Sequence, residues 1–262
     1  METPESTTGP ELDTAALEMK VKAMYRDVAE RPDAGYHFEL GRPLAERLGY
    51  PSELLDRIPA GAIESFAGVG YFLDLAALEP GETVVDLGSG SGMDSFCAAV
   101  TVGEAGRVIG IDFTAEQLAK SRRLANERGL GQLSFLEGRI ESLPVDDASA
   151  DCVISNGVIN LSPEKERVFG EAARVLRPGG RLAIADIVSE VQLKESIVCD
   201  ADLWASCIGG AAQEDDYVGA LEAAGLEVEA VSRNPYEFIS EQAVGATEKY
   251  GVKSVSLLAR KR

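Results

Sequence analysis

The chain has 262 residues, of which 45% are hydrophobic, and its formal net charge is −19. This length and apolar content suffice for one large α/β core with a small appended lobe. The acidic charge repels nucleic-acid phosphates and anionic lipid headgroups, which argues against a nucleic-acid or membrane partner. There is no apolar run of about 18 residues and no secretory pattern in the first ten, so the sequence predicts a cytoplasmic protein.

The cysteines are spaced too widely for a zinc site or a disulfide framework. The chain has four of them and one histidine, and no two cysteines form a Cys-x-x-Cys pair. A structural zinc site needs about four closely placed ligands. We therefore expect no metal, and we expect most of the thiols to be small buried hydrophobic groups.

The first third of the chain predicts a helical lobe. Residues 1–15 are polar and lack periodicity, so we expect them to be disordered. Residues 16–78 read as the lobe: an amphipathic helix over 12–29, then short helices interrupted by prolines. Those prolines are Pro43, Pro51 and Pro59.

Residues 79–262 predict the main domain, because apolar strands alternate there with helices. Strands are expected at 82–87, 107–112, 133–137, 150–155, 181–188, 227–233 and 252–260. Helices are expected at 93–102, 114–129 and 163–176, with a further helical stretch over 191–224. This order predicts an α/β fold with a mostly parallel seven-stranded sheet, helices on both faces and an antiparallel edge strand.

A glycine loop follows the first of these strands and precedes the first helix. It reads Gly88-Ser89-Gly90-Ser91-Gly92. Glycine permits positive φ and close approach of a ligand to the backbone, and the helix that follows begins with free N–H groups. Asp112 ends the next strand, about 20 residues further on, where a carboxylate can accept hydrogen bonds from both ribose hydroxyls. Together these features predict a nucleoside cofactor.

The loop favours a cationic nucleoside over a dinucleotide. It reads Gly-x-Gly-x-Gly, and Met93 occupies the place of the third glycine of a dinucleotide site. Asp86 lies just before the loop, where a carboxylate suits a sulfonium or ammonium group better than a pyrophosphate. A nicotinamide oxidoreductase remains the alternative, which NAD binding without binding of a sulfonium nucleoside would favour.

Four segments in residues 80–190 resemble the motifs of class I methyltransferases that use S-adenosylmethionine (AdoMet). They are VDLGSGSG, IGIDF, EGRIESLPV and VLRPGGRLAIADI. The resemblance implies a Rossmann-like fold and AdoMet as the cofactor. It also implies a cofactor site made of Asp86, Gly88, Gly90 and Gly92 at the methionine part, Asp112 at the ribose, Phe113 on the adenine, Ile140 and Glu141 at its edge, and Asn156 at the floor. Arg139 stands where the general pattern often has an acid.

Further segments resemble the arsenite methyltransferase family: HFELGR, LGYP, SFAGVG, ISNGVINLSPEKERVF and WASCIGGA. This resemblance implies As(III) as methyl acceptor, held through thiolates, with Cys207 and Asn156 as catalytic residues. Val69 and Gly157 occupy two positions where the family usually has cysteine, although arsenite delivered by glutathione would need fewer protein thiols. Two alternatives stay open: a small organic acceptor, and an AdoMet-binding protein without turnover. The oligomeric state is not indicated by the sequence.

Overall fold

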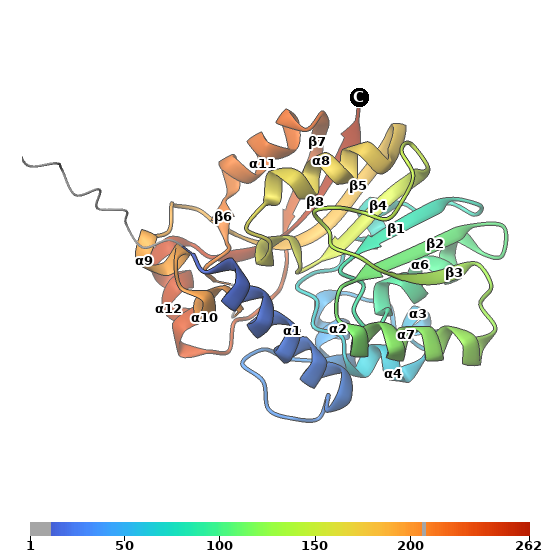
Figure 1. Ribbon diagram of the computed structural model, residues 1–262, viewed down its shortest axis with the longest axis horizontal. Helices are drawn as coiled ribbons and strands as arrows, with labels where there is room; N and C mark the ends of the chain where they lie inside the picture. Colours follow the sequence, from blue (N-terminus) through green and yellow to red (C-terminus); the bar gives the residue numbers. More distant parts are fainter. Residues whose placement is uncertain (1–11, 206–207) are drawn as a thin grey trace, which may run out of the picture.

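The computed structural model describes residues 12–205 and 208–262 and contains one mixed sheet (Figure 1). The strand order is β3-β2-β1-β4-β5-β8-β7, and the short β6 pairs with the end of β5. The strands are β1 (Thr83–Leu87), β2 (Arg107–Asp112), β3 (Leu133–Glu137), β4 (Ala150–Asn156), β5 (Leu176–Ser189), β6 (Ala212–Gln213), β7 (Leu226–Arg233) and β8 (Lys253–Lys261).

The predicted α/β fold with a mostly parallel sheet is confirmed. Strands β1 to β5 pair in parallel, whereas β8 runs antiparallel to both β5 and β7. We expected the antiparallel strand at the edge of the sheet. It is β8, which lies next to the edge strand β7. The strand order reverses between β1 and β4, and open α/β sheets bind ligands at the carboxyl ends of the strands flanking such a point.

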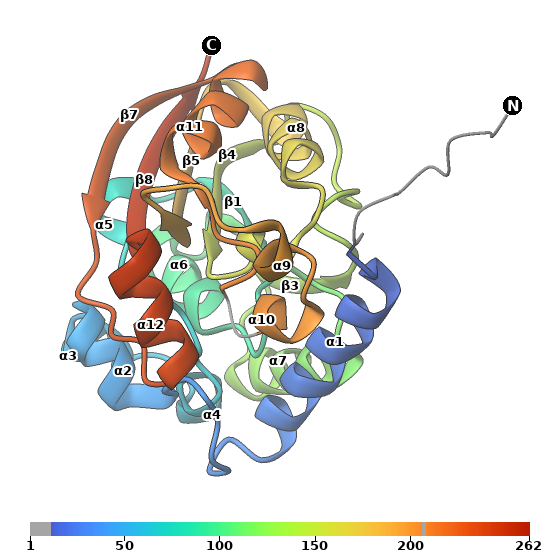
Figure 2. The ribbon, with the colours of Figure 1, turned by 90° about the vertical axis from the view of Figure 1, so that its left-hand side faces the viewer.

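Helices cover both faces of this sheet (Figures 1 and 2). Those of the main domain are α6 (Met93–Val102), α7 (Ala115–Arg128), α8 (Lys165–Val175), α9 (Glu195–Val198), α10 (Ala201–Ala205), α11 (Glu214–Ala223), α12 (Glu241–Tyr250) and the 3-10 turn η1 (Ile159–Leu161). Helices α8 and α11 bury their apolar sides against one face, and α6, α7 and the lobe bury theirs against the other. None of the described helices is both long and apolar enough to cross a bilayer.

The lobe contains α1 (Thr14–Glu30), α2 (Gly41–Leu48), α3 (Ser52–Leu55), α4 (Ala60–Glu64) and α5 (Leu73–Ala76). Pro51 and Pro59 precede α3 and α4 as expected, but Pro43 lies within the first turn of α2 and does not interrupt it. The backbone nitrogens of a first turn have no partner within the helix, so proline is tolerated there. Helix α1 begins at Thr14, where the helix expected over 12–29 overlaps the end of the segment expected to be disordered.

Two segments of the main domain differ from the expectation. We expected Pro178-Gly179-Gly180 to separate the helix from the strand, but β5 begins at Leu176 and includes these three residues. It begins there because Leu176 already pairs with Ala150 of β4, before a shift in register. The expected helical stretch over 191–224 is divided into α9, α10, β6 and α11. Glycines at 209 and 210 fit so closely against Trp204 that a Cβ at either would overlap it.

Residues 69–71, which we call the strap, join the lobe to the sheet. The Ser254 hydroxyl donates to the Val69 carbonyl at 2.6 Å, and the Ser256 hydroxyl donates to the Tyr71 carbonyl at 3.1 Å. The Asn156 amide at the end of β4 donates to the Gly70 carbonyl at 3.0 Å. The apolar side chains of α2 to α5 belong to the same buried cluster as those of α6. The lobe thus shares its core with one face of the sheet.

Candidate active site

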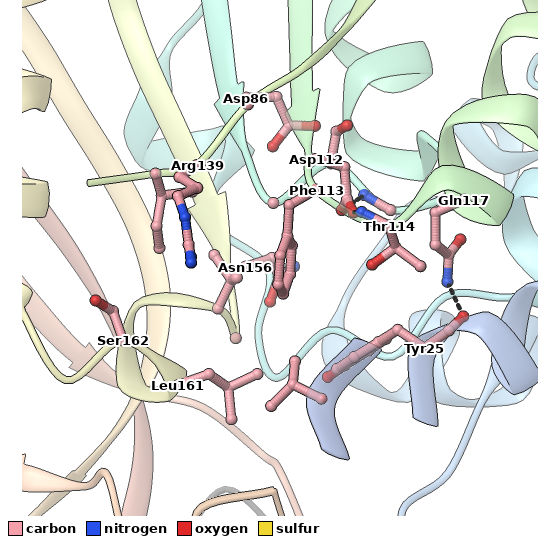
Figure 3. Close-up of a pocket in the computed structure, with 18 of the residues that line it drawn as sticks. Tyr25, Asp86, Asp112, Phe113, Thr114, Gln117, Arg139, Asn156, Leu161 and Ser162 are labelled. Carbon is pink, nitrogen blue, oxygen red and sulfur yellow. Dashed lines mark hydrogen bonds between the residues drawn. The ribbon is translucent and has the colours of Figure 1, made fainter. Parts of the chain in front are cut away.

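A pocket of about 780 Å³ lies at the carboxyl ends of β1, β2 and β4, with α1 along one side (Figure 3). That volume is within the range of small-molecule sites. Of the predicted cofactor residues, the pocket is lined by Asp86, Gly88, Gly90, Asp112, Phe113, Ile140, Glu141 and Asn156. The fold therefore brings together residues that are 70 positions apart in the chain.

Three buried carboxylates line this pocket. Asp86 on β1 is 2% exposed, Asp94 in the first turn of α6 is 6% exposed, and Asp112 at the end of β2 is 7% exposed. Within the described residues, none of the three forms an ion pair with a lysine or arginine. Buried charge without a partner is costly, so the pocket is electrostatically suited to a cationic ligand.

Asp112 holds the glycine loop in place while it faces the pocket. Its Oδ2 accepts a hydrogen bond from the Gly90 nitrogen at 2.9 Å, and its Oδ1 accepts one from the Thr114 nitrogen at 2.8 Å. Burial raises the pKa of Asp112, and the hydrogen bonds from Thr114 and Gly90 oppose that shift. Each carboxylate oxygen can accept a second hydrogen bond, so a ribose diol can still bind there.

Asp86 and Asp94 form the floor of the same site. The Ser95 hydroxyl donates to Asp86 Oδ2 at 2.6 Å, and the Tyr50 hydroxyl donates to Asp94 Oδ1. Burial raises the pKa of Asp94 to about 6, against the lowering effect of hydrogen bonds from Tyr50 and Asn156. Burial, followed by the neighbouring charge of Asp94, raises the pKa of Asp86 well above its usual range.

The glycines of the loop differ in what they do. Gly88 and Gly90 line the pocket with φ of +66° and +52°. Gly92 does not line it: a Cβ there would lie 2.7 Å from the Phe135 ring, so this glycine lets α6 begin close to β3. The buried Ser89 hydroxyl lines the pocket and has no hydrogen-bond partner among the described residues. It is therefore available to a ligand.

A further carboxylate, Glu18 of α1, lines the pocket, and no sequence motif indicated it. Arg139, which Figure 3 shows at the edge of the pocket, forms an ion pair with Glu18. Lys22 of α1 lies with its Nζ 4.9 Å from the centroid of the Phe113 ring. Glu18 thus supplies an acid beside the position where the general pattern has one. The sequence does not predict a contact between two residues 121 positions apart, because the contact forms only when α1 packs beside the pocket.

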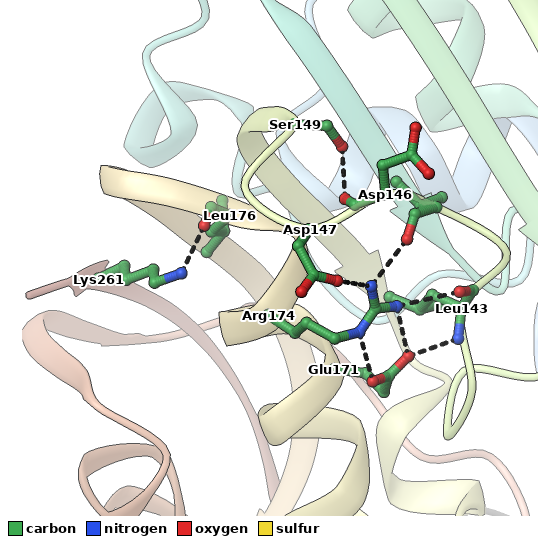
Figure 4. A network of polar contacts seen from close by, with 9 residues as sticks. Leu143, Asp146, Asp147, Ser149, Glu171, Arg174, Leu176 and Lys261 are labelled. Carbon is green, nitrogen blue, oxygen red and sulfur yellow. Dashed lines mark hydrogen bonds and ion pairs between the residues drawn. The ribbon is translucent and has the colours of Figure 1, made fainter.

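A polar network around Arg174 anchors the loop that carries Arg139, Ile140 and Glu141 (Figure 4). The Arg174 guanidinium pairs with Glu171 at 2.7 Å and with Asp147 at 2.6 Å. It also donates to the Leu143 carbonyl at 3.0 Å and to the Val145 carbonyl at 2.8 Å. One α8 side chain thereby holds residues 143–147 in place.

Removing this anchor should destabilise the protein. We expect Arg174→Ala to lower the free energy of unfolding by about 2–3 kcal/mol, because charge-assisted hydrogen bonds are lost and carbonyls lose their donor. Denaturant unfolding measures this. The matched control is Arg123→Ala, which removes the exposed ion pair with Glu127 and should change stability by less than about 1 kcal/mol. Equal losses in the two variants would contradict the anchoring role.

Asn156 lies at the floor of the pocket, with its amide fully engaged. Its Nδ2 lies 3.0 Å from Gly70 O, 3.0 Å from Asp94 Oδ2 and 3.1 Å from the Tyr50 hydroxyl, and its Oδ1 accepts from the Val69 nitrogen at 2.7 Å. An amide has only two N–H hydrogens for these three acceptors. The geometry therefore favours a positioning residue, which joins the strap to Asp94, over the catalytic residue that we expected.

Two of the four thiols lie in the core, Cys199 is half-buried at the end of α9, and the fourth lies outside the described residues. Cys207, the other expected catalytic residue, lies outside them. Cys97 and Cys152 are fully buried in α6 and β4, and burial raises the pKa of Cys152 to about 12. Among the described residues no cysteine lines the pocket, and no group of three His, Cys, Asp or Glu side chains could hold a metal ion.

Comparison with known proteins identifies this architecture. A family described as a methyltransferase domain matches residues 78–225. The chain belongs to that methyltransferase family. Its strand order, glycine loop and acid at the end of β2 are the features expected for AdoMet, and AdoMet is accordingly the cofactor.

The relatives of this methyltransferase include arsenite methyltransferases. One from Halobacterium salinarum is 44% identical over 199 residues, which are 75% of this chain and 51% of that protein. One from Mus musculus is 42% identical over 137 residues, 49% of this chain and 36% of that protein. The chain thus spans about half the length of the first of these curated relatives and 36% of the second.

Solved structures agree with the fold. An arsenic(III) S-adenosylmethionine methyltransferase from Chlamydomonas reinhardtii is 30% identical with a TM-score of 0.62, covering 84% of this chain and 73% of that one. A geranyl diphosphate methyltransferase in complex with sinefungin has a TM-score of 0.66 at 17% identity, which shows the shared fold alone. The methyltransferase therefore resembles the arsenite methyltransferases within a widespread fold.

Proposed function

We propose that this chain transfers the methyl group of AdoMet to As(III) or another small nucleophile in the pocket. The observation that carries the proposal is the set of buried carboxylates, Asp86, Asp94 and Asp112, without a cationic partner among the described residues. AdoMet supplies an electrophilic methyl group on a cationic sulfur. The protein needs chiefly to bind and align the two reactants, which is how proximity and orientation lower a barrier.

Each part of the pocket has a role in this proposal. Asp86 and the glycine loop hold the amino-acid end of the cofactor, and Asp112 accepts hydrogen bonds from the ribose. Phe113 and Ile140 enclose the adenine, while Glu18 and Glu141 lie at its polar edge. The unpartnered Ser89 hydroxyl offers one further hydrogen bond to the cofactor. Asn156 and Tyr50 keep the Asp94 carboxylate turned into the site.

The acceptor is proposed from the relatives and from chemistry. As(III) is the acceptor that their names indicate, and here Cys207 would bind it, with glutathione supplying further thiolates. A small organic acceptor is the second candidate, and a specific contact favours it. A Cβ on Gly157 would lie 3.2 Å from Val69 Cγ1, so the two positions where the family usually has cysteine are adjacent and carry no thiol. The cytoplasmic location remains a prediction.

A turnover assay tests the function. Purified protein is incubated with AdoMet, arsenite and glutathione, and S-adenosylhomocysteine (AdoHcy) and methylated arsenic are measured. If arsenite is the acceptor, Cys207→Ser should lower arsenic methylation at least about tenfold without changing AdoMet affinity. Cys199→Ser is the matched control, because Cys199 does not line the pocket.

The outcomes separate the alternatives. AdoMet binding with no arsenic product in the wild type would discard arsenite and leave the organic acceptor. AdoMet binding without AdoHcy formation on any acceptor would leave a binding protein without turnover. Absence of AdoMet binding, together with binding of NAD, would discard the proposal itself.

A further inference from the structure

The wall of the pocket opposite the carboxylates is apolar. Leu17, Val21 and Tyr25 of α1 line it, together with Leu161 of η1 and Phe66 of the lobe. Figure 3 shows Tyr25 and Leu161 at the far end of the cavity from Asp86 and Asp112. The cavity thus has a carboxylate-lined end for the cofactor and an apolar compartment, which we define by Leu17, Val21, Tyr25, Phe66 and Leu161.

Two polar side chains next to this compartment, Ser65 and Glu18, are already paired. The Ser65 hydroxyl donates to the Val28 carbonyl at 2.9 Å and accepts from Lys120 Nζ at 2.8 Å. Glu18 is paired with Arg139 and Lys22. Because such groups are satisfied within the protein, binding of a strongly polar acceptor here would not be compensated by new hydrogen bonds from them.

Three residues of the apolar compartment, Leu17, Val21 and Leu161, belong to a small buried cluster, against which Tyr25 and Phe113 also pack. Leu17 and Val21 pack with Leu161 and Trp204 into a cluster distinct from the two that cover the faces of the sheet. Lys165 lies with its Nζ 4.6 Å from the Trp204 ring centroid, and its ammonium group donates to the carbonyls of Ser162 at 2.8 Å and Asn160 at 3.3 Å. Burial of a ligand's apolar surface against this wall lowers the free energy of binding.

We propose that the methyl acceptor has an apolar organic body, which packs between α1 and η1 with its nucleophilic atom directed to the cofactor end. This inference rests on the proposed methyl transfer and specifies the class of its acceptor. A lone pair of the nucleophilic atom forms a bond to the methyl carbon as the bond from that carbon to sulfur breaks. The electron pair of the broken bond goes to sulfur, giving AdoHcy, and the proton of the acceptor goes to solvent.

Binding of two thiols to the AdoHcy complex tests this inference. Thiophenol carries an apolar ring, and 2-mercaptoethanol presents the same nucleophilic group on a polar body. Isothermal titration of AdoHcy-saturated protein should show thiophenol binding at least about tenfold more tightly, because ring burial adds apolar area. Val21→Asn should remove most of this preference, since it places an amide in the compartment.

Met19→Asn is the matched control, because Met19 is on the same helix with 67% of its side chain exposed. It should leave binding of both thiols unchanged. Equal affinity for the two thiols in the wild type, no thiophenol binding, or a preference that survives in Val21→Asn would overturn the inference. The AdoHcy titration that precedes each experiment separates the two proposals. If AdoHcy binds without a preference for thiophenol, only the apolar acceptor is refuted, whereas failure to bind AdoHcy refutes the proposed function.

Discussion

Replacing Gly88 with alanine is expected to weaken AdoMet binding about 100-fold, equivalent to about 3 kcal/mol. A Cβ at this position would lie 2.5 Å from Val158 Cγ2 and 2.8 Å from Val158 Cβ. Both residues line the pocket, so a shift of the glycine loop or of the segment after β4 changes the surface that the cofactor contacts. The φ of +66° adds strain for any residue with a Cβ, about 1–2 kcal/mol. Calorimetric titration with AdoMet and AdoHcy measures the effect.

Gly129→Ala is the matched control for this strain. Gly129 has a φ of +65° at the end of α7, and a Cβ there would meet nothing within 4 Å. The two variants should therefore lose comparable stability through their backbones, and only Gly88→Ala should lose cofactor affinity. Wild-type affinity in Gly88→Ala would show that the loop does not contact the cofactor closely.

Acidification is expected to weaken AdoMet binding more than AdoHcy binding. The pKa of Asp94 is raised to about 6 by burial, so its carboxyl is anionic above that pH and neutral below it. Asp86, whose pKa is also raised, lies at the amino-acid end that the two ligands share, so its protonation should weaken both of them alike. AdoMet carries a sulfonium charge that AdoHcy lacks. As pH falls through about 6, protonation of Asp94 removes an anion that attracts this charge, and the dissociation constant for AdoMet should rise by up to about tenfold per pH unit.

Titrations of both ligands between about pH 5 and pH 8 measure this dependence. The ratio of the AdoMet to the AdoHcy dissociation constant should rise toward acid pH in the wild type. Asp94→Asn fixes a neutral group at this position, so the ratio should be higher at neutral pH and should vary less. Parallel pH profiles for the two ligands in the wild type would contradict an electrostatic role for the buried acids.

The sheet could be predicted closely because its strands are short and buried and are separated by helices. β2 and β3 begin and end at the predicted residues, and so does α6. The glycine loop and Asp112 were predictable because their spacing is local: both follow directly from strands whose carboxyl ends meet at one edge. A buried strand followed by glycines therefore indicates both the fold and the cofactor end of the site.

Other features depend on contacts that sequence spacing does not encode. Tyr50 binds Asp94 across 44 positions, and Glu18 binds Arg139 across 121. Asp94 did carry a local signal, since an acid in the first turn of the helix after a glycine loop lies at the helix N-terminus and faces the ligand. β6 has only two residues, and its pairing with β5 gives no periodic pattern.

The strap bears on how acceptor specificity can be re-engineered. Its carbonyls are bound by Ser254, Ser256 and Asn156, which belong to β8 and β4 rather than to the lobe. Because the acceptors are backbone carbonyls, a lobe taken from a homologue can accept the same hydrogen bonds, and a chimaera joined near residue 79 should fold where the recipient sheet keeps donors at these three positions. Helix α1 is bound in the same manner, since Gln117 and Lys120 of α7 donate to the Tyr25 and Ala29 carbonyls, so it too should be transferable to a chain that keeps both donors.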